Sequence, residues 1–372
     1  MTADELVEIL QLINTDGIGP VSFYSWLRKT GSIRASLDEI AAQKEIFPRG
    51  RAELLVEKAR QIGAEIITFK DSRYPQSLKE LNDAPPVVYT LGRGELLNYS
   101  PAVSIVGARN SSIAGRKIAS RIAYDLTQND VLVISGMARG IDSAAHKGAM
   151  YAKDQQGPTI AVLGTGVDEI YPIENKELYT RIREQGLIIS EFPFGTKAQV
   201  SNFPRRNRII SALSDATLVV EAGIHSGSLI TAKLALEQGK EIFAVPGSPA
   251  ENKSSGSNQL IKDGAVLTES ADDILDFLAL NRNYRIKNNT QAFLPLDKAE
   301  NNVNISEQKK MPTGVLKSQC PLLEMISYEG VDIDELFRSC GLSQADFFSQ
   351  VLELELSGKI ERQVGNRLAR IK

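Results

Sequence analysis

Six short, almost wholly apolar runs recur along the middle of the chain. They are Val103–Val106, Val131–Ser135, Ile160–Leu163, Leu187–Ser190, Thr217–Val220 and Ile242–Val245. Such continuous apolar character is typical of strands buried on both faces of a parallel sheet. Amphipathic segments of helical length separate them, namely Arg116–Gln128, Asp142–Ala152, Lys176–Gln185 and Ser228–Gln238. The alternation predicts an α/β domain over residues 66–280 with a Rossmann-like, doubly wound, mostly parallel sheet.

The pattern changes at both ends of the chain. Residues 1–65 show helical periods around the turn Gly17–Pro20, which predict a small helical domain that resembles SAM or helix-hairpin-helix modules. That turn is either a phosphate-holding hairpin or a simple helix–helix connection. Residues 281–315, polar and rich in Asn and Lys, predict a flexible linker. Residues 316–372 predict three helices and a β-ribbon at Lys359–Ile371, an arrangement like a winged helix.

Composition excludes several classes of protein. No run of 18 apolar residues occurs and the first residues are acidic, so we expect neither a membrane span nor a secretory signal, and a cytoplasmic location. Two cysteines, Cys320 and Cys340, and two histidines, His146 and His225, are too few to suggest a disulfide framework or a metal site. The net charge of −3 gives no general attraction to phosphate, so any nucleic-acid contact requires a local basic patch.

Glycine and arginine follow the predicted strands, at the sheet edge where ligands bind in such folds. The residues that we single out there are Gly107, Arg109, Ser111, Gly136, Arg139, Gly164, Gly166, Ser226, Gly227 and Ser228. Glycines and helix N-termini favour a bound anion, although glycine also marks tight turns in any α/β fold. Neither G-x-G-x-x-G nor G-x-x-x-x-G-K-[ST] is complete, so we expect no cofactor. Glu221 is either a general acid/base or a hydrogen-bond acceptor for the loops.

A second cluster combines cations with aromatic rings. Its members are Lys197, Phe203, Arg205, Arg206, Asn207 and Arg208, with Phe192 and Phe194 nearby. Three arginines at a predicted helix start would repel one another unless an anion is bound. Rings on which bases stack, interleaved with cations that follow the backbone, are typical of single-stranded DNA binding, whereas core packing is the alternative for each phenylalanine.

These residues resemble the DNA-processing protein A (DprA, or Smf) family of bacterial transformation and recombination. The motifs that carry the resemblance are VGARNSSIAG (106–115), SGMARGIDSAAHKGAM (135–150), VLGTGVDEIYP (162–172), SEFPFG (190–195), NFPRRNRIISALSD (202–215), VVEAGIHSGSLITAKLALEQGKEIFAVPG (219–247) and GSNQLIKDGA (256–265). The resemblance implies a non-catalytic protein that binds single-stranded DNA, helps to load the RecA recombinase and forms a homodimer. It implies phosphate contacts from Arg109 and the NFPRRNR run, and a base received near Phe203 or Phe194.

The resemblance also implies finer assignments. Lys197 is our candidate for the pocket lysine of the family, and Ile261 and Leu267 are candidates for the dimer interface, with ordinary core packing as their alternative. Family members often have Ser and Tyr where this chain has Ala108 and Ala114, so hydroxyl contacts from those positions are not expected.

Two alternative functions stay open at this point. One is a nucleotide-processing enzyme such as a phosphoribohydrolase, although the loop from Glu221 to Thr231 lacks the glutamate that follows P-G-G-x-G-T in those enzymes. The other is a protein-only adaptor with a vestigial DNA pocket. The expected second helix of the winged-helix-like domain, Gln344–Leu356, is acidic, which favours protein contact or a degenerate wing over duplex DNA.

Overall fold

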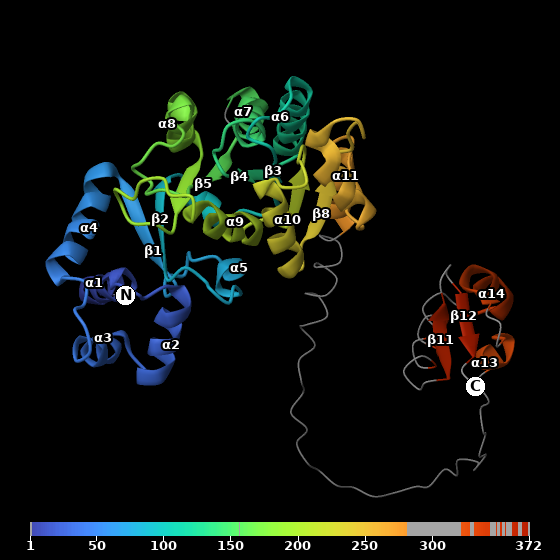
Figure 1. Ribbon diagram of the computed structural model, residues 1–372, viewed down its shortest axis with the longest axis horizontal. Coiled ribbons are helices and arrows are strands. Elements are labelled where there is room, and N and C mark those ends of the chain that lie inside the picture. The colour runs from blue at the N-terminus through green and yellow to red at the C-terminus, as the bar shows by residue number, and fades with distance from the viewer. Residues whose placement is uncertain are drawn as a thin grey trace, which may run out of the picture. The chain divides into compact units, whose positions relative to one another are not determined.

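The chain forms two compact units, residues 1–294 and 295–372, in the computed structural model (Figure 1). The described residues are 2–155, 157–280, 321–327, 331–342, 347, 350–351, 354, 359–363 and 367–370. The expected linker, Cys320 and the ribbon tip Gly365–Asn366 lie outside these ranges. Among the described residues, no helix is long and apolar enough to cross a membrane.

A nine-stranded sheet organises the first unit. Its strands in chain order are β1 (Ala64–Thr68), β2 (Val87–Gly92), β3 (Ala102–Val106), β4 (Leu132–Ser135), β5 (Thr159–Val162), β6 (Leu187–Ser190), β7 (Ala216–Val219), β8 (Glu241–Ala244) and β9 (Val266–Leu267). They lie in the order β1-β2-β6-β5-β4-β3-β7-β8-β9, and only β2 runs against its neighbours. The chain leaves β3 toward β4 on one side and returns beside β3 with β7 on the other. The switch point between β3 and β7 confirms the predicted doubly wound fold.

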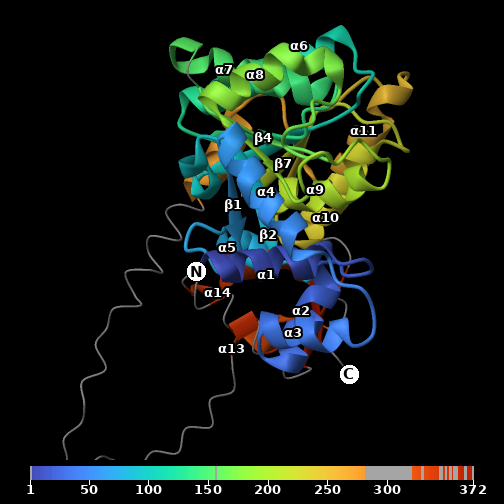
Figure 2. The same ribbon diagram turned by 90° about the vertical axis from the view of Figure 1, so that its left-hand side faces the viewer.

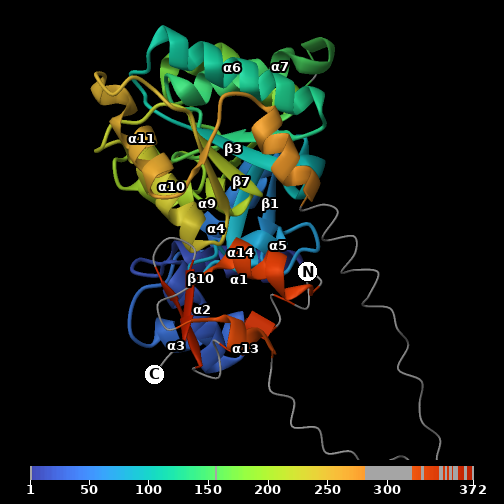
Figure 3. The same cartoon turned by 90° about the vertical axis from the view of Figure 1, so that its right-hand side faces the viewer.

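Helices cover both faces of the sheet. After β1 they are α5 (Gln76–Lys79), α6 (Ile113–Gln128), α7 (Ile141–Gln155), α8 (Lys176–Gln185), α9 (Asn202–Ala212), α10 (Gly227–Glu237) and α11 (Ser255–Lys262), followed by a helix over residues 272–280, with short 3-10 turns at Gly94–Asn98, Ile173–Asn175 and Asn252–Ser254. Figures 2 and 3 show α6 and α7 together on one face, and α9 and α10 on the opposite face. The parallel strands are therefore buried on both sides, as their apolar runs require.

The six expected strands are present, each within one residue of its expected bounds. Three strands were not expected: β1, β2 and β9. β1 lies at one edge of the sheet and exposes Glu65, and β9 has only two residues, so neither makes a long apolar run. β2, by contrast, is a buried run up to Leu91 in which only Thr90 is polar, and the pattern could have revealed it.

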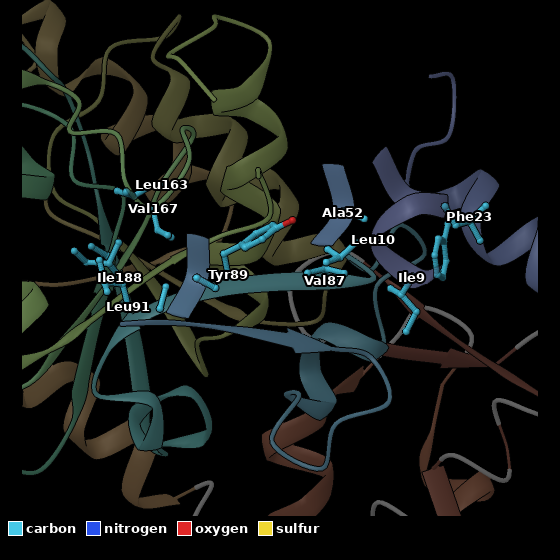
Figure 4. Close-up of a cluster of buried hydrophobic side chains, with 14 of the residues drawn as sticks. Ile9, Leu10, Phe23, Ala52, Val87, Tyr89, Leu91, Leu163, Val167 and Ile188 are labelled. Atoms are coloured by element: carbon cyan, nitrogen blue, oxygen red, sulfur yellow. The ribbon is translucent and has the colours of Figure 1, made fainter. Parts of the chain in front are cut away.

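Four helices precede the sheet and confirm the helical character of the N-terminal region. They are α1 (Ala3–Asn14), α2 (Pro20–Thr30), α3 (Ile33–Ala41) and α4 (Arg49–Ile62). One hydrophobic cluster joins them to the sheet: Ile9, Leu10 and Phe23 belong to the same buried set as Tyr89 and Ile188. In Figure 4, Tyr89 lies between side chains of the helices and those of the central strands. The helices thus share a core with the end of the sheet that holds β1 and β2.

The second unit has the elements of a winged helix. They are α13 (Pro321–Met325), β10 (Val331–Asp332), α14 (Ile333–Cys340), β11 (Ile360–Gln363) and β12 (Arg367–Arg370). The three strands form an antiparallel sheet in the order β10-β12-β11, so the expected ribbon is confirmed. Of the expected helix Gln344–Leu356, only Phe347, Gln350, Val351 and Leu354 are described, and its acidic residues lie outside the described part.

Candidate nucleic-acid interface

A cleft of about 380 Å³ opens at the carboxyl ends of the central strands, beside the switch point. Its walls come from the loops after β3 and β4 and from the first turns of α9 and α10. The lining residues are Val106, Gly107, Arg109, Ala138, Asp142, Tyr171, Val200, Phe203, Pro204, Arg206, Asn207, Ile210, Ser226, Gly227, Ser228, Ile230 and Thr231. A smaller recess continues from it between Arg139, Gly164 and Thr165. This is the place where open α/β sheets bind their ligands.

Arg206 of α9 forms the floor of the cleft. Only 4% of the residue is exposed, and its Nη1 donates to the carbonyl oxygen of Gly136 at 2.6 Å and to that of Val162. A Cβ on Gly136 would lie 2.5 Å from this nitrogen, so glycine is required here for the arginine to fit. Burial lowers the pKa of Arg206 to about 10, against the opposing attraction of Asp142. The guanidinium therefore stays charged at neutral pH.

Asp142 in the first turn of α7 places one carboxylate beside these cations. It is buried, accepts a hydrogen bond from the amide of Ala138 at 3.3 Å and lines the cleft with Arg206. Burial raises the pKa of Asp142, while Arg206 and Arg109 act to lower it. Sequence reasoning missed this residue, because an acidic residue in the first turn of a helix is ordinarily explained by the helix dipole.

An aromatic pair stands above this floor. The rings of Phe203 and Tyr171 have centroids 5.5 Å apart and are tilted by 36°. The Arg109 guanidinium lies over the Phe203 ring, with Cζ 4.9 Å from the centroid, which is a cation–π contact. Sequence reasoning singled out Phe203 and Arg109 but not Tyr171, which comes nine residues after the end of β5. The cleft thus combines two arginines, two rings and one carboxylate.

Two family models match the chain. The model described as DNA recombination-mediator protein A matches residues 65–279, and the model of the DprA winged helix domain matches residues 317–366. The chain belongs to the DNA recombination-mediator protein A family. The predicted resemblance and the winged-helix-like C-terminal domain are therefore confirmed.

Relatives support the same membership in this recombination-mediator family. The Smf protein of Synechocystis is 34% identical over 85% of this chain and 82% of its own length. The Smf protein of Escherichia coli is 36% identical over 84% of this chain and 79% of its own length. The solved DprA structure from Streptococcus pneumoniae covers 74% of this chain and 93% of its own, with a TM-score of 0.59 and 31% identity. A solved structure of the Helicobacter pylori DprA, whose subject is the single-stranded DNA binding mode of that protein, covers 60% of this chain and 97% of its own. Its TM-score is 0.51 and its sequence identity is 28%. A DNA-processing role in recombination follows from this membership.

In this protein, the arginines of the NFPRRNR run have different partners and do not all face the cleft. Arg208 is buried and its Nη2 donates to Glu191 Oε2 at 2.7 Å, and Arg205 lies 3.5 Å from the same oxygen and over the Phe192 ring. Only Arg206 lines the cleft. Glu191 supplies the negative charge for two of the three arginines, so their mutual repulsion does not require a bound anion.

Several other predicted site residues lie outside the cleft. The exposed Lys197 pairs with Glu169 at 2.8 Å, and Gly166 packs against the loop after β6, where a Cβ would meet the Pro193 carbonyl at 2.7 Å. Ser111 is buried and absent from the lining of the cleft. Phe194 packs edge-on against Tyr89 at 4.9 Å, so core packing explains this ring.

The remaining predicted residues lie at the cleft or its recess. Gly107, Ser226, Gly227 and Ser228 line the main cavity, with Asn207 donating to the carbonyl of Gly227 at 3.5 Å; Gly136, Arg139 and Gly164 line the recess. Glu221 accepts hydrogen bonds from the amide of Ser112 at 3.0 Å and its hydroxyl at 2.7 Å, which confirms the interpretation of Glu221 as an acceptor for the loops.

The remaining expectations concern metals and the helical region. Among the described residues, no three His, Cys, Asp or Glu side chains are grouped to hold a metal ion.

The turn at Gly17–Pro20 joins α1 to α2, with Gly19 at the start of α2. Exposed cations on these helices pair with acidic side chains, for example Lys29 with Glu39 and Arg49 with Glu53. Lys44 donates to the carbonyl oxygen of Asp16 beside the turn, and a phosphate contact there stays a prediction.

Proposed function

We propose that the cleft binds single-stranded DNA and that the protein mediates recombination by holding the strand without reacting with it. The observation that carries this proposal is the stack of Arg109 on Phe203 above the buried charge of Arg206, inside one cavity. Cations suit the phosphates of a strand, and rings suit its unpaired bases. The subject of the Helicobacter pylori structure, a relative that binds single-stranded DNA, supports the same ligand for this chain.

The cations of the cleft differ in exposure and therefore in the part of a DNA strand that they can contact. Arg109 and Arg139 are exposed at the mouth and can follow phosphates, Arg139 by exchanging its exposed ion pair with Glu174 at 3.5 Å. Nη1 of Arg206 is occupied by two carbonyl groups, which leaves Nη2 for an anion that enters deeply. The N-terminus of α10, which starts at Gly227, faces the same cavity and adds the positive end of its dipole.

A catalytic role is not supported by the side chains near the cleft. Glu221 is occupied by Ser112, and Asp142 by the amide of Ala138. His146 is fully buried against Thr159, out of reach of a ligand in the cleft. An enzyme that hydrolyses nucleotides is accordingly the weaker candidate, and we infer a non-catalytic binding protein.

Family membership supports two partners in this role. We infer that the protein passes its strand to the RecA recombinase in the cytoplasm, and that it acts as a homodimer. The dimer proposal rests on the short edge strand β9, where Leu267 is 47% exposed and Val266 is 38% exposed. Ile261 of α11 is half-buried nearby in the sequence. Exposed apolar side chains such as these favour contact with a second copy of the chain.

Titration of a labelled oligo-dT and a duplex of equal length, at about 50 and 200 mM salt, tests the proposal. We expect wild type to prefer the single strand. The variant Arg109→Ala/Arg139→Ala should bind more weakly and lower the slope of log K against log salt by about 1.4, at about 0.7 for each lost phosphate contact. Lys197→Ala, which removes an exposed cation outside the cleft, is the matched control and should change neither. Unchanged binding by the double variant, or equal affinity for the duplex, would refute the proposal.

A further inference from the structure

The Phe203 ring, expected from the sequence to receive a base, is already contacted on several sides. A Cβ placed on Gly164 would lie 2.9 Å from its Cδ1, so the glycine backbone packs against the ring. The Arg109 guanidinium carbon is 4.9 Å from its centroid, and the Tyr171 ring is 5.5 Å away. Phe203 is accordingly half-buried.

A base cannot enter between these partners as they stand. A flat group sandwiched between two others needs about 7 Å between them, twice the carbon contact distance of about 3.5 Å. Both separations at Phe203 are shorter than that. Stacking on Phe203 would therefore require Arg109 or Tyr171 to leave, and with Arg109 the cation–π contact would be lost.

Tyr171 presents the accessible ring. Its exposed fraction is 43%, and it lines both the main cavity and the recess. Arg109 and Arg139 line the recess with it, so cations flank the ring. The Phe203 ring contacts it at a centroid distance of 5.5 Å, and the exposed part of the Tyr171 ring is accessible to a ligand. A ring flanked by cations is what a base and its adjoining phosphates require.

We propose that Tyr171 is the residue on which a nucleobase stacks, and that Phe203 is a positioning residue that holds Arg109 and Tyr171 in place. This inference rests on the proposed binding of single-stranded DNA and assigns its base contact. Stacking tolerates any base, because every base has a π-face. The contact at Tyr171 thus distinguishes an unpaired strand from a duplex, whose bases are stacked on one another.

A DNA strand without bases distinguishes contacts to bases from contacts to phosphates. Binding of oligo-dT is compared with binding of an abasic oligonucleotide of equal length for wild type, Tyr171→Ala, Tyr171→Phe and Phe203→Ala. Tyr151→Ala is the matched control, since Tyr151 is an exposed tyrosine of α7 outside the cleft. Circular dichroism establishes that each variant is folded.

Tyr171→Ala should bind oligo-dT about 5- to 150-fold more weakly, the range for loss of one stacked base, and should bind the abasic strand as wild type does. Tyr171→Phe should keep the affinity of wild type, because the ring is retained. Phe203→Ala should weaken the binding of both strands, because Arg109 loses its support. Tyr151→Ala should change nothing.

Two results would overturn the assignment. Unchanged oligo-dT binding by Tyr171→Ala shows that no base uses this ring, and an equal loss for both strands shows that the tyrosine only shapes the cleft. The proposed function fails differently: wild type then binds neither strand, or Arg109→Ala leaves both affinities unchanged.

Discussion

His146 of α7 makes the stability of the first unit depend on pH. The residue is fully buried, and its Nδ1 lies 2.8 Å from the Thr159 hydroxyl, which itself donates to the Val133 carbonyl at 2.6 Å. Since that hydroxyl has no second proton, Nδ1 must be the donor. Nε2 has no hydrogen-bond partner, so a second proton would bring a charge into the core, which the backbone of Ser135 offsets only in part. Burial, and then the charge of Arg206, lowers the pKa of His146 to about 3.

The sign of the effect follows from the two pKa values. In the unfolded chain His146 takes up a proton near pH 6.5, whereas in the folded chain it does so only near pH 3. The free energy of unfolding is therefore highest above pH 6.5 and falls as the pH drops toward 3. Between pH 7 and pH 5 the loss from this group is about 1.9 kcal/mol. Because pH 5 lies well above the folded pKa, this loss is set almost wholly by the unfolded pKa.

Urea unfolding at pH 7 and pH 5 measures the loss. Trp26 of α2, the only tryptophan, reports the unfolding of the first unit by its fluorescence. Wild type is compared with His146→Gln, which has no titrating ring, so that the contributions of carboxylates cancel. We expect wild type to lose about 1.9 kcal/mol more than the variant. Equal losses in the two proteins, or a His146 ring that titrates near pH 6.5 in the folded protein, would refute the reasoning.

Two further predictions concern the interior and the sheet edge. Glu191→Ala should lower the free energy of unfolding by about 2 kcal/mol, because the buried Arg208 keeps only Asp83, whose side chain is 45% exposed, as its counter-charge. Glu191→Leu/Arg208→Leu should recover most of the loss in the same urea assay. If the single variant is as stable as wild type, the pair is unimportant for folding. Leu267→Lys should convert a dimer to a monomer in sedimentation velocity, because the charge opposes pairing at β9; a dimer that persists argues for another interface.

The fold was predictable because burial on both faces leaves an unmistakable pattern. A strand such as β3 or β6 is buried at every position and is apolar apart from one serine, so its bounds can be read to within a residue. Edge strands have no such constraint, which is why β1 and β9 were missed. The position of the cleft was also predictable, since the carboxyl ends of parallel strands meet at one edge.

The different contacts of the arginines were harder to predict from the sequence. Successive residues of a helix point about 100° apart, so Arg205 and Arg208, three residues apart, share one side of α9 and Arg206 points to another. Helical periodicity could have shown that they do not face one groove. Which of them meets Glu191 depends on how α9 packs against the loop after β6, and no local pattern encodes that contact.

The shared hydrophobic cluster makes the four N-terminal helices inseparable from the sheet. A fragment that began at β1 would expose Tyr89 and Val87 to water. This would create an exposed hydrophobic patch at the end of the sheet opposite to β9. Truncation at that point would therefore yield a product prone to aggregate, and its failure to bind DNA would say nothing about a role of the helices in recognition. Substitutions on the outer faces of the helices are the informative way to ask that question.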